Sequence, residues 1–153
     1  MKSSLQSGQD IYNNALLLGN AFYNMSFYGN ARYFYEGNIR GQGMSYPEAI
    51  DFHFRQQLTD NSIAYGYYQK ALAAAQDDEQ RAKCLFLMSK CERNGWYNRT
   101  LLNFNNNNYT YQEPSGTDFV EWSSFKELKK YPQTAFYKNA IKECGYFKKV
   151  VGK

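Results

Sequence analysis

Residues 18–23 read Leu-Gly-Asn-Ala-Phe-Tyr, and this stretch decides the fold that the sequence predicts. A glycine between bulky side chains, as at Gly19, is typical of a crossing where two helix backbones approach and a neighbouring aromatic ring fills the remaining gap. A related segment, Leu-Met-Ser-Lys-Cys-Glu, follows at residues 87–92. Between them, residues 64–71 carry Ala, Tyr and Ala at helical spacing. The chain therefore predicts packed helices related by internal repetition.

Outside these segments, helical periodicity and capping residues predict further helices. We expect helices at residues 10–28, 49–58, 62–76, 79–93, 117–130 and 133–150. Asn94-Gly95 is expected to end the fourth helix. The first helix is expected to bury one face, made of Ile11, Ala15, Leu18, Phe22 and Met25. Long loops are expected at about residues 37–46 and 98–116. Only 3 Pro, against 15 Tyr and 11 Phe, also favour helices packed through bulky side chains.

The segments resemble the tetratricopeptide repeat, whose first helix carries Leu-Gly-x-x-Tyr and whose second carries Ala, an aromatic and Ala. The matching positions are Leu18, Gly19 and Phe22, then Ala64, Tyr68 and Ala71, then Leu87 and Cys91. The chain also resembles the C-terminal part of large, functionally uncharacterised tetratricopeptide proteins of Bacteroidetes-type bacteria. This resemblance implies an all-α fold, with antiparallel helix pairs stacked as a short, irregular α-solenoid. It implies a single helical domain over residues 1–153, which would be a fragment of a longer repeat protein.

The resemblance also implies a function. In this family the concave surface is lined by polar positions of the first helices. Carried over, the candidate partner-binding face is Asn13, Asn20, Tyr23, Asn24, Arg81, Ser89, Glu92 and Arg93. We expect a non-enzymatic scaffold for protein–protein interaction that binds a polar peptide. Two alternatives stay open: a glycan-binding or outer-membrane-associated repeat protein, and a terminal cap whose apolar end near residues 10–22 meets upstream repeats.

Motifs that carry chemistry are missing from the sequence. The single histidine, His53, has no partners at metal-ligand spacing, and we expect it to be structural or exposed. There is no Gly-rich phosphate loop and no Gly-x-Ser-x-Gly motif. Cys84 and Cys91 stand on one expected helix with Cα atoms about 10.5 Å apart, which suits core thiols better than a disulfide. We therefore expect no catalytic residue, metal or cofactor.

The charge and hydropathy of the chain limit the kinds of partner that we expect. The net charge is +4, and the basic clusters at residues 126–130 and 148–153 are typical of solvated helix faces. A nucleic-acid partner is therefore not expected. No apolar run has the length of a membrane span, and residues 1–10 lack the apolar core of a signal peptide. The compartment stays open, because a signal removed from the chain would place it in the periplasm or cell envelope.

Overall fold

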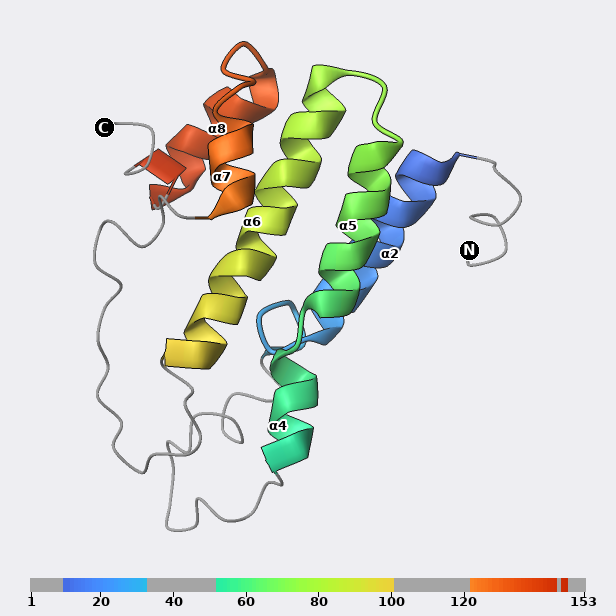
Figure 1. Ribbon diagram of the computed structural model, residues 1–153, viewed down its shortest axis with the longest axis vertical. Coiled ribbons are helices and arrows are strands. Elements are labelled where there is room, and N and C mark those ends of the chain that lie inside the picture. Colours follow the sequence, from blue (N-terminus) through green and yellow to red (C-terminus); the bar gives the residue numbers. More distant parts are fainter. Residues whose placement is uncertain (1–9, 33–51, 101–121, 146, 149–153) are drawn as a thin grey trace.

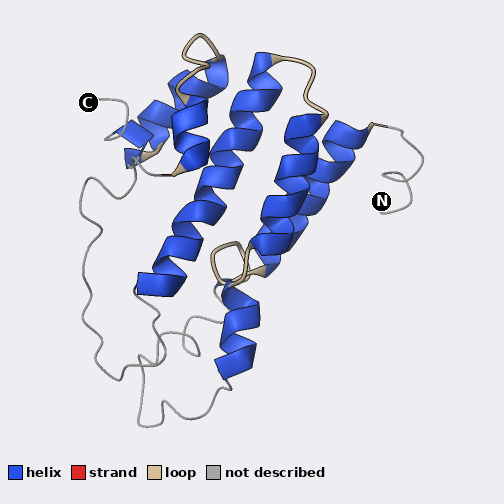
Figure 2. Cartoon of the chain, in the orientation of Figure 1, coloured by secondary structure: helices blue, strands red, loops and turns tan. Residues whose placement is uncertain are grey.

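The computed structural model describes residues 10–32, 52–100, 122–145 and 147–148, and every regular element in these ranges is a helix (Figures 1 and 2). The helices are α2 (Ile11–Met25), α4 (Phe52–Thr59), α5 (Ser62–Ala73), α6 (Asp78–Thr100), α7 (Ser123–Leu128) and α8 (Ala135–Glu143). The expected all-α class is confirmed for this part of the chain. The stacking of the helices as a solenoid stays a prediction.

Helices α2 and α5 run antiparallel and side by side (Figure 1). They meet at Gly19, where an added Cβ would lie 2.5 Å from Cε1 of Tyr68. The Tyr68 ring is only 1% exposed and fills the space that the missing side chain leaves. Its hydroxyl donates a hydrogen bond to Asn20 Oδ1 at 3.0 Å. The predicted close approach at Gly19 is therefore confirmed.

Helix α6 is the central element, because it contributes to both buried clusters that the described residues form. Cys84, Met88 and Cys91 face α2 and α5. Ala82 and Leu85 instead face α7 and α8. In Figure 1, α6 lies between these two groups of helices. A helix with apolar residues on two sides is expected to be buried on both, which explains how one long helix joins the whole described structure.

Two carboxylates of α6 hold the starts of α7 and α8. Glu92 accepts hydrogen bonds from the backbone N–H of Ser124, at 3.2 Å to Oε2, and from its hydroxyl, at 2.7 Å to Oε1. Glu79 accepts from the N–H groups of Ala135 and Phe136, the latter at 2.9 Å. The first N–H groups of a helix have no partner inside it and carry a partial positive charge. Both short helices are thus anchored to α6 by capping as well as by packing.

The expected end of the fourth helix at Asn94-Gly95 is wrong, since α6 continues to Thr100. The stop was predicted from the turn preference of these two residues. In the structure, Asn94 is fully buried and hydrogen-bonded to other parts of the chain. A Cβ on Gly95 would meet only the Arg99 side chain, at an ordinary 3.5 Å. Tertiary contacts therefore override the local preference.

The expected core face of α2 is only partly correct. Ala15 and Leu18 are buried, but Ile11 is 40% exposed and Met25 is 64% exposed. The buried residues of α2 are Ala15, Leu16, Leu18, Gly19 and Tyr23. The Gly19 side of α2 faces the core, because the close approach to Tyr68 occurs there. In this orientation Met25 faces outward.

The boundaries of the last helix also differ from those expected. The expected helix at 133–150 is interrupted after Glu143, because Cys144 has an extended backbone conformation. In this part of the chain Ala140 and Phe147 are buried, and Phe136, Ile141 and Cys144 pack against the same cluster. Residues 117–121, the loop at 37–46 and most of the loop at 98–116 lie outside the described residues, as does the His53 side chain.

Candidate binding surface around Tyr23

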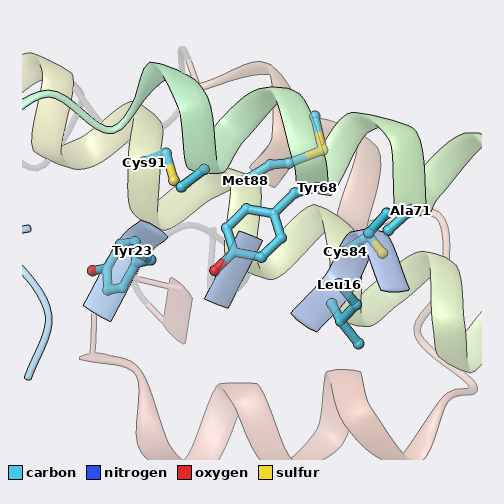
Figure 3. Close-up of a cluster of buried hydrophobic side chains, with 9 residues drawn as sticks. Leu16, Tyr23, Tyr68, Ala71, Cys84, Met88 and Cys91 are labelled. Atoms are coloured by element: carbon cyan, nitrogen blue, oxygen red, sulfur yellow. The ribbon is translucent and has the colours of Figure 1, made fainter. Parts of the chain in front are cut away.

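Tyr23, one residue of the expected binding face, lies where α2 meets α6. It belongs to the buried cluster that α2, α5 and α6 build together (Figure 3). Its side chain is 6% exposed, and its hydroxyl accepts a hydrogen bond from Asn94 Nδ2 at 3.2 Å. Burial raises the pKa of Tyr23, so the hydroxyl stays protonated at neutral pH. The tyrosine is thus fixed in one position by packing and by a polar partner.

Asn94 links three parts of the chain. Besides Tyr23, its Nδ2 donates to Asn61 Oδ1 at 2.6 Å, at the start of α5. Its Oδ1 accepts from Arg93 Nη2 at 3.2 Å, which helps to orient that guanidinium. Asn61 Nδ2 is also buried, and it has no hydrogen-bond acceptor among the residues that the structure describes. A buried amide of this kind keeps its position only when its remaining bonds are well made.

One turn later, Asn98 repeats this role. It donates from Nδ2 to the backbone carbonyl of Thr59 at 2.9 Å and accepts from the hydroxyl of Tyr28. Burial raises the pKa of Tyr28 well above its ordinary value. The C-terminal half of α6 is therefore tied to the chain after α2 and to the end of α4 through polar groups.

Lys90 lies beside Tyr23. Its Nζ is 4.5 Å from the centroid of the Tyr23 ring, which is within the range of a cation–π contact. Burial, with the nearby charge of Arg93, lowers the pKa of Lys90. Among the residues that the structure describes, no carboxylate pairs with this ammonium group. Its three N–H donors therefore have no anionic acceptor from this part of the chain.

Tyr23, Lys90 and Arg93 together form what we call the Tyr23 surface. Lys90 and Arg93 stand three residues apart, so they lie on the same side of α6. The charge of Arg93 lies close enough to Tyr23 to lower its pKa, against the larger effect of burial. Two cations beside an aromatic ring can bind carbonyl, amide or carboxylate oxygens.

The remaining α2 residues of the expected face have separate positions. Asn13 and Asn24 are exposed. The Asn13 side-chain amide donates to both carboxylate oxygens of Asp10, at 3.0 and 2.8 Å. Asn20 is half-buried, and its Oδ1 accepts from Tyr68. Asn13 and Asn24 are thus placed at the surface, while Asn20 mainly supports the packing of α2 on α5.

The α6 residues of the expected face do not gather in one place. Ser89 is fully buried and donates to the carbonyl of Phe86 within its own helix. Glu92 caps α7. Arg81 pairs with Asp78 at 3.2 Å near the start of α6. Of the eight expected residues, the structure thus brings Tyr23 and Arg93 together and uses Ser89 and Glu92 for packing and capping.

Two residues were not predicted from the sequence: Lys90, which belongs to the Tyr23 surface, and the buried Asn94, which supports it. Lys90 stands three residues before Arg93, and this spacing, which places both on one side of a helix, is a usable signal. Asn94 has the local character of a helix stop. Its spacing of four residues from Asn98 places two amides on one side of a longer helix, but only if α6 is known to continue.

The described residues show no sign of a metal or thiol site. No group of three or more His, Cys, Asp or Glu side chains among them could hold a metal ion. Cys84 and Cys91 are free and buried, as expected for core thiols. Burial raises the pKa of Cys84 to about 11 and that of Cys91 to about 12, so both are protonated and inert at neutral pH. Across the same ranges, no helix combines the length and apolarity that a membrane span requires.

Comparisons with known proteins do not assign this chain to a family. The chain matches no protein-family model, no curated protein and no solved structure. The function must therefore be argued from the geometry of this chain alone.

Proposed function

We propose that this chain is a non-enzymatic helical scaffold that binds a polar peptide segment of another protein at the Tyr23 surface. The observation that carries the proposal is Lys90: a half-buried ammonium that packs on the Tyr23 ring and has no carboxylate partner in the described residues. Removing a cation from water is costly unless an acceptor replaces the lost hydration. A peptide backbone or polar side chain would supply such an acceptor.

The surroundings of Lys90 support a pre-formed surface. Asn94 holds both Tyr23 and Arg93 through hydrogen bonds from one side chain. Binding to groups that are already fixed loses less conformational entropy than binding to mobile side chains. Tyrosine and arginine are also the residues that most often dominate binding energy at protein interfaces.

The test is a peptide selection with the intact chain. A displayed random-peptide library is selected against the protein, and binding of the recovered peptides is measured by fluorescence anisotropy. Lys90→Met keeps an unbranched side chain on the Tyr23 ring but removes the charge. We expect it to weaken the selected peptides about tenfold or more, since a charged hydrogen bond is worth roughly 1.5–3 kcal/mol.

Lys138→Met is the matched control, because Lys138 is exposed on α8 and the substitution removes the same charge elsewhere. It should leave binding unchanged. Peptides that bind wild type and Lys90→Met equally would contradict the proposed surface. A library that yields no specific peptide would contradict the scaffold function itself.

Glycan binding remains a second candidate on one observation. Phe22 of α2 and Tyr67 of α5 stack with ring centroids 5.5 Å apart, and both side chains are only partly buried. Lys70 Nζ lies 5.2 Å from the Tyr67 centroid and occupies part of that aromatic surface. A glycan array would show binding that Phe22→Ala abolishes if this candidate were correct. An array without hits would remove it.

A further inference from the structure

The outer side of α2 carries a row of apolar residues that nothing in the described structure covers. Leu17 is 49% exposed and Met25 is 64% exposed, and Ala21 between them is exposed as well. The three residues are four apart, so they form one ridge along the helix. We call Leu17, Ala21 and Met25 the α2 outer ridge.

The ridge points away from the core. Ala21 is two residues from Gly19 and two from Tyr23, and each residue turns an α-helix by about 100°, so Ala21 faces about 200° away from both. Gly19 contacts α5, and Tyr23 contacts α6. The hydrophobic core is therefore complete without the ridge, and covering the ridge requires something outside the described helices.

Charge narrows what can cover the α2 outer ridge. Residues 11–31 contain no Asp, Glu, Lys, Arg or His, although the chain as a whole carries a net charge of +4. A charged partner would have to desolvate its charges against a face that offers no opposite charge. A second copy of the same uncharged face meets no such cost and no like-charge repulsion.

The ridge is also symmetric in a way that suits a second copy. Leu17 and Met25 lie equally far from Ala21, on either side of it. Two α2 helices that cross antiparallel at Ala21 would place each Leu17 against Met25 of the second copy. The small alanine side chain at the crossing would let the two backbones approach closely. A two-fold interface requires this kind of self-complementarity.

We propose that two copies of this chain associate through their α2 outer ridges, in an antiparallel crossing centred on Ala21. The interface is small, because a single helix pair buries less than the roughly 1,200–2,000 Å² of a stable complex. The association is therefore expected to be reversible and concentration-dependent. It does not cover the Tyr23 surface, since Tyr23 lies on the opposite side of α2.

Analytical ultracentrifugation of the intact chain over a wide range of concentrations tests this proposal. We expect a monomer–dimer equilibrium that salt does not weaken, because no charge is involved. Ala21→Arg should abolish the dimer by placing two cations at the crossing. Ala73→Arg adds the same charge at an exposed position of α5 and should leave the equilibrium unchanged.

Circular dichroism of both variants serves as the control for folding: unchanged helical spectra are expected, and a loss of association can then be assigned to the interface. A chain that stays monomeric at all concentrations would overturn the proposal, and would leave the ridge to a further helical layer of a longer protein. Dimerisation that Ala21→Arg does not affect would place the interface elsewhere and would equally overturn it.

Discussion

At position 19 the side chain has to be a single hydrogen atom, because the Tyr68 ring occupies the space where a Cβ would stand. The nearest ring atom would be 2.5 Å from that Cβ, and the ring is buried and cannot swing aside freely. Gly19→Ala should therefore lower the free energy of unfolding by roughly 1–2 kcal/mol, as overpacking outweighs the better helix propensity of alanine. Urea denaturation followed by circular dichroism measures this change.

Gly66 provides the control for Gly19. It also lies inside a helix, but a Cβ there meets nothing within 4 Å. Gly66→Ala should increase the free energy of unfolding by about 0.5–1 kcal/mol, through helix propensity alone. If both substitutions stabilise the protein equally, the close approach at Gly19 does not exist.

Asn94 is the residue whose polar contacts should matter most to stability. Asn94→Ala removes a fully buried amide and leaves Tyr23 and Asn61 without their bonds to it. Because buried polar groups left unsatisfied cost about 1–3 kcal/mol, we expect a loss of roughly 2–3 kcal/mol in urea denaturation. Asn139→Ala, at an exposed position of α8, should change stability by less than about 0.5 kcal/mol. Equal effects would show that Asn94 is not buried.

Gly19 and Asn94 differ in how far their roles can be predicted from the sequence. The role of Gly19 was predictable, because a glycine flanked by bulky residues in a helical pattern marks a close crossing of two helices. The role of Asn94 was not, because its partners Tyr23 and Asn61 stand 71 and 33 residues earlier in the chain. Nothing local distinguishes a buried asparagine from one that ends a helix.

At the scale of the elements, α7 and α8 are short and depend on carboxylates that α6 supplies. Glu92→Ala would leave the start of α7 without its cap, at a cost of about 1–2 kcal/mol. We expect the amide of Ser124 to exchange with deuterium faster in this variant, while the amides of α5 are unaffected. Hydrogen exchange read by NMR measures both.

Glu127→Ala controls for the loss of a carboxylate near the same helix. Among the residues that the structure describes, the Glu127 side chain forms a surface ion pair with Lys130, and such pairs contribute about 0–1 kcal/mol. Exchange at Ser124 should stay near the wild-type rate. If it rises as much as in Glu92→Ala, the protection of α7 does not come from the cap.

The helices could be located from the sequence better than they could be oriented. The central parts of α5 and α6 follow from periodicity, and the buried Ala64, Tyr68 and Ala71 match the predicted face. The rotation of α2 did not follow, because apolar residues stand on several of its sides and only the contact at Gly19 selects one. The candidate site was predicted only in part. Tyr23 and Arg93 were expected, whereas the role of Lys90 depends on its packing against Tyr23, which follows from the orientation of α2.

At the scale of the whole molecule, burial of thiols and tyrosines predicts how stability depends on pH. Burial raises the pKa of Cys84 from 9.0 to about 11, that of Cys91 from 9.0 to about 12 and that of Tyr12 from 10.0 to about 12. It also raises the pKa of Tyr28 and Tyr68. Above pH 9 the unfolded chain releases these protons while the folded chain retains them. Stability is therefore complete below pH 9 and is lost as the pH rises through 9 to 12.

A shift of one pKa unit at a fully buried group corresponds to about 1.4 kcal/mol, and solvent screening makes the contribution of the more exposed Tyr12 smaller. A small domain has only roughly 5–15 kcal/mol of stability. We therefore expect the protein to unfold cooperatively at alkaline pH, and the buried tyrosines to ionise only as it unfolds. Tyrosinate absorbance should rise in two phases: exposed tyrosines near pH 10, then the buried ones together with the loss of helical circular dichroism. Serine does not reproduce a buried thiol, so Cys84→Ser and Cys91→Ser are unsuitable variants. Cys84→Ala is the suitable variant, and relative to its own stability at pH 7 its alkaline unfolding should shift to higher pH. Tyrosines that all titrate in a single phase, with the helices intact, would contradict the burial on which this dependence rests.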